Sequence, residues 1–488
     1  MLSKEPRHPN IIWLTLDHVT FHHYQHMTGA RPILKTYEKL CQNGTEFTNC
    51  KSVHPLCMPA RASMLTGVYT HKHGKYNNKE GQGSKHTPLI MEYLERSDYR
   101  MGYFGKNHSG FENLNEYDID YINFSSYGPE ENPIYDEYGN AYMSKEYRQF
   151  ISRKGIDSVT YHQEWGADLF RGLPNKEYNL LEVDTQNAFS CGTLTPENVH
   201  EIDFLVDLAK NWIEKRHNKP FVLRLDTWAP HPAYIVPAEF ANKHLKPEEI
   251  ELPPEFYKEI SVHKTFSRDY MEKISNHLNL DSEESWKHVL MRAYEQYSYI
   301  DMRLGEFIEW LEQTGLRQST IILLTADHGD AIASKGGMFD KCGDMQEEVM
   351  EIPMVVDIPW IQGGKPNDSL VSNLDVVPTV LDLLNIPVPA HMDGMSLKAM
   401  IENRIPGRKA LMCEHYGHMF YDVLQRTLYY KGFKYIVTTG YEEQLFHIDK
   451  DPFELHDLAK DPLYTQILQE MKEQLYVERQ RYNDISPD

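Results

Sequence analysis

Short apolar runs recur along the chain between longer stretches whose apolar residues repeat at helical spacing. The clearest runs, each followed closely by polar or charged residues, span residues 11–16, 100–104, 221–225 and 321–325. Short apolar runs bounded in this way are typical of strands that are buried on both faces. Helical spacing is clearest at residues 202–215 and 286–313. The alternation predicts an α/β fold in which helices flank a large mixed, mostly parallel sheet.

The pattern changes toward the end of the chain and once in its middle. From about residue 398, short aromatic strands precede a helix near residues 464–482. This predicts a small C-terminal α+β subdomain over residues 398–488, after a main domain over residues 1–397. Residues 111–194 are rich in Tyr, Asn, Gly and acids, and we expect them to form an insertion over the ligand-binding edge of the sheet.

Polar side chains stand directly after each of the four predicted strands. Asp17 follows the first, Lys106 the second, the segment 226–231 the third, and Asp327 with His328 the fourth. In open α/β sheets, ligands bind beyond the carboxyl ends of the strands. We therefore expect these side chains to gather at one site.

Composition and charge narrow the range of partners. The 488 residues allow two to three domains, and 50 Lys and Arg against 72 Asp and Glu leave a net charge of −22. This charge opposes general attraction to nucleic acid or to an anionic membrane, so neither is expected as a partner. Six cysteines are too few for a disulfide scaffold. No apolar stretch is long enough for a signal peptide or a membrane span, which predicts a soluble, cytoplasmic protein.

The most informative stretch runs from Cys57 to Gly67. It reads Cys-Met-Pro-Ala-Arg-Ala-Ser-Met-Leu-Thr-Gly and resembles the signature of the sulfatase family, Cys-x-Pro-x-Arg followed by Thr-Gly. Five specified positions match by chance about once in three million windows. Pro59 suits the first turn of a helix expected at residues 60–65, whose free N–H groups would attract an anion near Cys57.

Four further segments resemble the family in chain order. They are Asn10-Ile11-Ile12 leading to Asp17, Gly105-Lys106-Asn107-His108, Ala229-Pro230-His231-Pro232, and Leu324 to Asp330 with Asp327-His328 at its centre. Lys341, fourteen residues after Asp327, stands where the family places a sulfate-contacting lysine. The resemblance covers about residues 9–462, with 111–194 largely unmatched. It implies an alkaline-phosphatase-like fold and the hydrolysis of an aryl or carbohydrate sulfate ester.

The resemblance also implies a mechanism and a set of site residues. A separate maturation enzyme would oxidise Cys57 to formylglycine, whose hydrate attacks sulfur. The implied metal ligands are Asp17, His18, Cys57, Asp327 and His328. Arg61 would orient the hydrate, Lys106, His231 and Lys341 would bind the sulfate, and His231 or His108 would protonate the leaving alkoxide. His71 matches a position that contacts the hydrate less directly.

One departure from the family bears on the metal. The family usually has paired acids after the first strand, whereas this chain has Asp17-His18. His18 either ligates, which makes the site less anionic, or points elsewhere. Calcium is the family's usual ion, but imidazole suits manganese or zinc better, so both calcium and manganese remain candidates.

Two other functions are alternatives to sulfate ester hydrolysis. Relatives with the same fold and motif cysteine hydrolyse phosphonate monoesters or phosphodiesters, and a non-catalytic binding protein could use the same scaffold. Mass analysis of the Cys57 peptide would distinguish the non-catalytic binding protein from an enzyme.

His22, His23 and His26 lie close to His18 in the sequence. With 24 histidines in the chain, these three are interpreted as ordinary core or surface residues.

Overall fold

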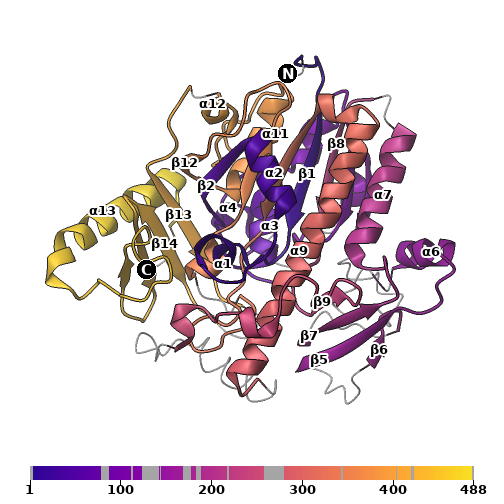
Figure 1. Cartoon of the computed structure of the whole chain (residues 1–488). Coiled ribbons are helices and arrows are strands. Elements are labelled where there is room, and N and C mark those ends of the chain that lie inside the picture. The colour runs from indigo at the N-terminus through magenta and orange to yellow at the C-terminus, as the bar shows by residue number, and fades with distance from the viewer. Residues whose placement is uncertain are drawn as a thin grey trace.

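The computed structural model describes residues 4–78, 87–111, 114–123, 142, 144–168, 177–182, 188–216, 219–257, 280–341, 345–402, 404–418 and 422–485. Within these ranges, an eight-stranded sheet forms the centre of the molecule (Figure 1). Its strands, in spatial order, are β12 (Asn367–Ser372), β2 (Thr45–Lys51), β11 (Met354–Asp357), β10 (Thr320–Ala326), β1 (Asn10–Leu16), β8 (Phe221–Asp226), β3 (Arg100–Gly105) and β4 (Ile119–Asn123).

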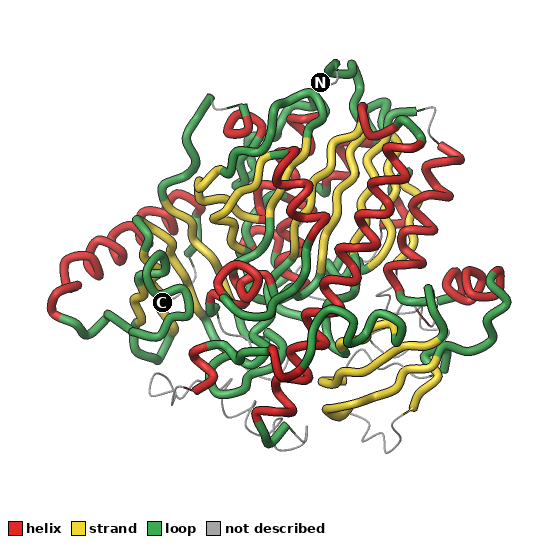
Figure 2. Tube along the Cα trace, viewed as in Figure 1, coloured by secondary structure: helices red, strands yellow, loops and turns green. Residues whose placement is uncertain are grey.

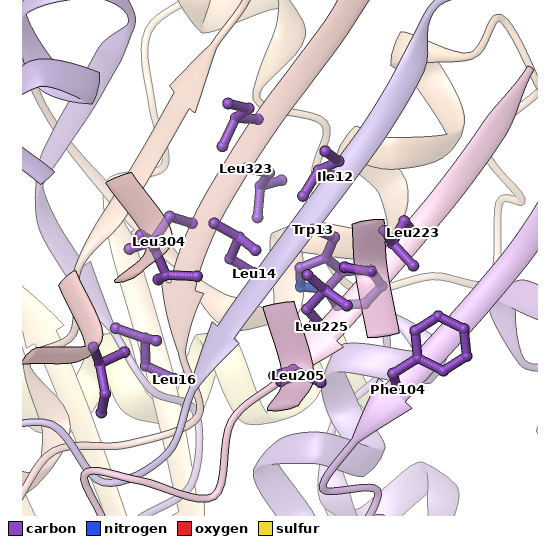
Figure 3. Packing of buried hydrophobic residues seen from close by; sticks show 14 of the residues in the cluster. Ile12, Trp13, Leu14, Leu16, Phe104, Leu205, Leu223, Leu225, Leu304 and Leu323 are labelled. Atoms are coloured by element: carbon purple, nitrogen blue, oxygen red, sulfur yellow. The ribbon is translucent and has the colours of Figure 1, made fainter. Parts of the chain in front are cut away.

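The large sheet is mostly parallel, as the sequence predicts. β11 runs antiparallel to both of its neighbours, and the other pairs are parallel. The four predicted strands are β1, β3, β8 and β10, and they lie side by side in the middle of the sheet. Every residue of β1 is buried, because helices cover both faces of the sheet. Leu14 of β1, Leu225 of β8 and Leu323 of β10 pack in this core (Figure 3).

Helices lie on both sides of this sheet. The helices of the described ranges are α1 (Phe21–His26), α2 (Lys35–Asn43), α3 (Cys57–Thr66), α4 (Thr70–His73), α5 (Ile90–Leu94), α6 (Lys145–Arg153), α7 (Glu201–Arg216), α9 (Glu283–Gln313), α10 (Glu347–Met350), α11 (Val376–Leu383), α12 (Lys398–Ile401) and α13 (Thr465–Tyr482). In Figure 1, α2, α7 and α9 cover one face, and α3 and α11 lie behind the sheet. The predicted helix at residues 60–65 begins earlier, at Cys57 itself. None of these helices has the length and hydropathy to cross a bilayer.

The segment 111–194 does not form a separate insertion throughout. Its strand β4 pairs with β3 at the edge of the large sheet, which corrects the prediction for that part. Residues 124–141 lie outside the described ranges. The later part supplies β5 (Thr160–Asp168), β6 (Glu177–Asn179) and β7 (Ala188–Thr195), which form a second sheet with β9 (Tyr234–Pro237) in the order β6-β5-β7-β9. Figure 2 shows this sheet at the lower right.

A third sheet forms the C-terminal subdomain. Its strands are β13 (Ala410–His415), β14 (Gln425–Tyr430), β15 (Phe433–Thr438) and β16 (Gln444–Phe446), paired antiparallel in that order. Helix α13 packs against this sheet, and its Met471 and Leu475 join the same apolar cluster as Leu428. The small sheet and its helix agree with the predicted α+β subdomain.

Candidate active site

Four potential metal ligands meet at the carboxyl edge of the large sheet. Asp17 follows β1, Asp327 and His328 follow β10, and Cys57 opens α3. Their ligand atoms all lie within 4.8 Å of one another. Asp17 Oδ1 is buried and has no hydrogen-bond partner among the described residues. Because a buried carboxylate oxygen without a donor is costly, this donor set fits a divalent cation.

His328 presents one ring nitrogen to Cys57. Its Nδ1 lies 2.8 Å from the Gly329 carbonyl oxygen, and the tautomer that donates there leaves a lone pair on Nε2. Nε2 lies 3.0 Å from Cys57 Sγ. The backbone N–H groups of His18 and His328 donate to Asp327 Oδ1 over 3.2 and 2.8 Å. The ligand atoms are therefore oriented by hydrogen bonds from the loops after β1 and β10.

Arg61 binds three carboxylates, two of which belong to this group of potential metal ligands. The guanidinium is completely buried, and it donates from Nε to Asp327 Oδ2 over 2.8 Å and from its two Nη atoms to Asp226 Oδ2 over 2.9 Å and Asp17 Oδ2 over 3.2 Å. One turn of α3 separates Arg61 from Cys57. The helix that places Cys57 therefore also fixes the two acids beside it.

Two lysines bring positive charge to the same place. Lys106 forms an ion pair with Asp17, and its ammonium lies 3.9 Å from the centre of the Trp228 ring. Lys341 Nζ lies 2.7 Å from Asp340 Oδ1 and 3.4 Å from His231 Nε2. Gly105, before Lys106, has a φ of +109°, and a Cβ there would lie 1.8 Å from the Asp226 carbonyl oxygen. Only glycine allows β3 to turn toward the site this closely.

These charges act on Cys57. Burial alone raises the pKa of its thiol, but Lys341, Lys106 and His328, together with a hydrogen bond to His108, bring that pKa well below its usual value. Burial, helped by Lys341 and Lys106, keeps the pKa of His231 well below the usual value for histidine. The site therefore stabilises negative charge at position 57 and holds His231 neutral at rest.

His18 lies beside the four-residue group and outside it. Its Nε2 is 3.1 Å from Asp330 Oδ1 and its Nδ1 is 3.4 Å from Asp340 Oδ1. Its ring centre is 4.9 Å from those of His231 and His328. The imidazole thus links the loops after β1 and β10 to Asp340.

Family comparisons agree with this geometry. The family model described as Sulfatase matches residues 9–386, and the model for the C-terminal region of N-sulphoglucosamine sulphohydrolase matches residues 335–481. The chain belongs to the sulfatase family. It is a sulfuric ester hydrolase, and its fold is the alkaline-phosphatase-like fold that the resemblance implies.

Individual relatives are distant but cover most of the sulfatase. Arylsulfatase K of Bos taurus is 26% identical over 441 residues, which are 86% of this chain and 72% of the relative. A solved structure in complex with its substrate D-glucosamine-2-N,6-O-disulfate has a TM-score of 0.70 at 19% identity, covering 98% of this chain and 99% of the other. The phosphonate monoester hydrolase of Agrobacterium radiobacter has a TM-score of 0.72 at 17% identity, covering 97% and 96%.

His71, for which the resemblance implies a less direct contact with the hydrate, is bound to residues near the end of the chain in this sulfatase. Its Nδ1 lies 2.6 Å from Glu414 Oε1 and its Nε2 lies 3.0 Å from the Tyr482 carbonyl oxygen. Both ring nitrogens are therefore engaged with the C-terminal subdomain. His71 joins the two parts of the molecule.

Two further acids build the site. Asp226, the last residue of β8, accepts hydrogen bonds from Arg61, Arg224 and Tyr103. Asp340 pairs with Lys341 and faces His18. Asp226 belongs to the segment 226–231 that the sequence predicts at the site, but without a stated role, whereas nothing in the local sequence marks Asp340.

Glu201 positions the loop that carries His231. Its Oε1 accepts the N–H groups of Trp228 over 2.9 Å and Ala229 over 2.6 Å. Trp228 in turn supports Lys106. Burial raises the pKa of Glu201 to about 7, although the two N–H groups oppose this.

We expect Glu201→Gln to flatten the dependence of stability on pH. Between pH 4.5 and 7, Glu201 keeps its proton in the folded state but releases it in the unfolded chain. The free energy of unfolding of the wild type should therefore fall by up to about 3 kcal/mol over this range, relative to that of Glu201→Gln. Urea unfolding across this range measures the difference. Glu201→Ala removes the oxygen that accepts both N–H groups and should lower kcat, because the loop with Trp228 and His231 loses its support. Parallel stability curves for wild type and Glu201→Gln would contradict the assignment.

Proposed function

We propose that this sulfatase hydrolyses the sulfate monoester of an aryl or carbohydrate alcohol at residue 57, after Cys57 has been converted to formylglycine. The observation that carries the proposal is the position of Cys57. Its Sγ lies at the start of α3, grouped with Asp17, Asp327 and His328, and the charges of Lys106 and Lys341 act on it. Such a position suits a nucleophile that faces an anionic ester.

Asp17, Asp327 and His328, with residue 57, would hold one divalent metal ion, either calcium or manganese. Bound there, the ion acts as a Lewis acid toward a sulfate oxygen and lowers the pKa of a coordinated hydroxyl. Arg61 fixes the carboxylates of Asp17 and Asp327 in place by hydrogen bonds. Lys106 and Lys341 would neutralise charge on the sulfate oxygens.

Conversion of Cys57 requires a formylglycine-generating maturation enzyme as a partner. The signature Cys57-x-Pro59-x-Arg61 supports this requirement, because it is the family's pattern for that modification. As its hydrate, the aldehyde supplies one oxygen to attack sulfur and a second hydroxyl to release sulfate.

The leaving alcohol requires a proton, and His231 is placed to deliver it. His231 Nδ1 lies 2.7 Å from the Pro232 carbonyl oxygen, so it holds its proton there. The lone pair on Nε2 faces Lys341 Nζ at 3.4 Å. Although burial opposes it, Asp340 and Cys57 raise the pKa of Lys341, so Lys341 keeps its proton and its charge, and Nε2 of His231 is the atom that would carry a proton to the alkoxide. His108, hydrogen-bonded to Cys57, stands nearer the nucleophile.

The substrate beyond the sulfate would meet the C-terminal subdomain. His418 interacts electrostatically with Lys341, Asp340 and Cys57, and burial with Lys341 lowers its pKa to about 4. Arg426 of the same subdomain is instead paired with Asp484 over 2.7 Å. A saccharide sulfate is supported by the substrate named for the solved neighbour, and an aryl sulfate by the names of the relatives.

Phosphonate monoester hydrolysis is the second candidate. It is favoured by a fold similarity to phosphonate monoester hydrolases, with a TM-score of 0.72, that is as close as the similarity to sulfatases. The pair Lys106 and His108 favours sulfate, because this Lys-x-His segment is the one that resembles the family's sulfatases.

Parallel rates with an aryl sulfate and an aryl phosphonate monoester test the proposal, using protein co-produced with a maturation enzyme. We expect a higher kcat/KM for the sulfate and a loss of roughly 10²–10³-fold in Lys341→Ala, since a buried cation that faces the developing charge is removed. Lys243→Ala, at an exposed position, is the matched control and should keep the wild-type rate. Faster hydrolysis of the phosphonate would favour the second candidate.

Manganese should restore the chelated enzyme at least as well as calcium. The group contains an imidazole, His328, and has a second imidazole, His18, where the family usually has an acid; calcium prefers oxygen ligands, whereas imidazole suits manganese. Rates after removal of metal and addition of each ion measure this. Strict dependence on calcium would contradict it.

A further inference from the structure

A second cluster of possible metal ligands lies outside the active site. His22 and His26, four residues apart on α1, face the same side of the helix. His22 Nδ1 lies 2.6 Å and His26 Nε2 2.9 Å from a single atom, Oε2 of Glu351, which directly follows α10. The three ligand atoms lie within 4.8 Å of one another, and the cluster shares no residue with the active-site group.

The cluster borders a cavity of about 620 Å³. His22, His26 and Glu351 line it together with Lys51 and Tyr429, so water and ions can reach the ligand atoms. The His26 side chain is 31% exposed, whereas Glu351 is 8% exposed. Phe453 packs against the rings of His22 and His26 with centres 5.1 and 6.2 Å away. The cluster thus has one open side and one apolar side.

Charge around the cluster leaves Glu351 available to a cation. Lys51 lies 2.6 Å from Glu347 Oε2 but 3.5 Å from Glu351 Oε1, so it is neutralised mainly by Glu347. The Oε2 atom can accept hydrogen bonds from both imidazoles. One divalent cation would instead bind both nitrogen lone pairs and the carboxylate at once.

We propose that His22, His26 and Glu351 form a second metal site, which binds a borderline divalent cation such as Zn²⁺ with a water from the cavity as its fourth ligand. Two imidazoles and one carboxylate are a regular zinc ligand set. Ligand atoms at zinc distances stand about 3.3 Å apart in a tetrahedron, so the present atoms need to separate by roughly half an ångström. The exposed side of His26 permits this movement.

Such an ion would join parts of the chain that are distant in sequence. α1 begins four residues after Asp17, and Glu351 lies more than 300 residues further on. Phe453 comes from the segment after β16. The site is therefore structural: it fixes the helix that follows the first active-site acid to the residue that follows α10.

Metal content and thermal unfolding of the full chain test the proposal. After chelation and re-equilibration with Zn²⁺, wild type should hold one more equivalent of zinc per chain than His26→Ala, and zinc should raise its Tm by more. His244→Ala, at an exposed histidine, is the matched control and should behave as wild type. With Co²⁺ in place of zinc, wild type should show the visible absorption of a four-coordinate site, which His26→Ala lacks.

A second variant distinguishes the loss of a metal ligand from an effect of side-chain packing. Glu351→Gln keeps an acceptor oxygen for the two imidazoles but removes the charge, so it too should lose one equivalent of zinc. Equal zinc content and equal zinc-dependent Tm shifts in wild type, His26→Ala and His244→Ala would overturn the proposal, whether or not Glu351→Gln folds.

Discussion

Cys57→Ser should lose multiple turnover by a thousandfold or more and accumulate a sulfated protein after at most one turnover. The introduced serine has one hydroxyl, which can attack sulfur when metal is present. It has no second hydroxyl to expel the sulfate, so the ester remains on the protein. Intact-protein mass spectrometry after incubation with an aryl sulfate detects the adduct.

Cys57→Ala is the matched control, because it keeps the helix start but offers no nucleophile. It should remain unmodified under the same conditions. Repeated turnover by the serine variant would contradict the proposed role of the aldehyde. So would full activity of wild-type protein from a host that lacks the maturation enzyme.

The central strands could be predicted because they are buried on both faces. β1, β8 and β10 have no exposed residue, so their sequences are mainly apolar, with the buried Arg224 of β8 as an exception within its strand. β2 and β12 were not predicted, since each has exposed or half-buried positions and mixes polar with apolar residues. β11 has only four residues, too few for a pattern. Local sequence therefore reveals the middle of the sheet better than its edges.

The site could be predicted in part for a related reason. Asp17, Lys106 and Asp327 directly follow predicted strands, and parallel strands bring their carboxyl ends to one edge. Which charges meet there could not be predicted, because it depends on tertiary packing. Arg61, for example, reaches Asp226, which is 165 residues away.

The cluster at α1 shows the same limit. The spacing of His22 and His26 is visible in the sequence, yet their shared partner Glu351 is more than 300 residues away. Without that partner, the two histidines are indistinguishable from ordinary ones. The interpretation of these two residues changes only when the carboxylate is seen between them.

Arg61→Leu should have the largest effect on stability. The substitution leaves the carboxylates of Asp17, Asp226 and Asp327 buried without the cation that binds all three. Removing one partner from a buried ionic group destabilises a protein by about 3–5 kcal/mol. Arg153→Leu is the matched control, because it removes an exposed ion pair of similar length, 2.8 Å to Asp207, which is worth under about 1 kcal/mol. Urea unfolding of both variants gives the comparison.

The metal adds a second part to the Arg61 prediction. Asp17 and Asp327 are proposed ligands and Asp226 is not, so added metal should recover some of the stability lost in Arg61→Leu. Asp226 stays paired with Arg224, so Asp226→Asn, introduced into the same variant, should recover nothing further. Arg61→Lys keeps the charge but cannot reach three acceptors, and it should fall between wild type and Arg61→Leu. If Arg61→Leu unfolds at the same urea concentration as wild type, the proposal that Arg61 stabilises the three buried carboxylates is wrong.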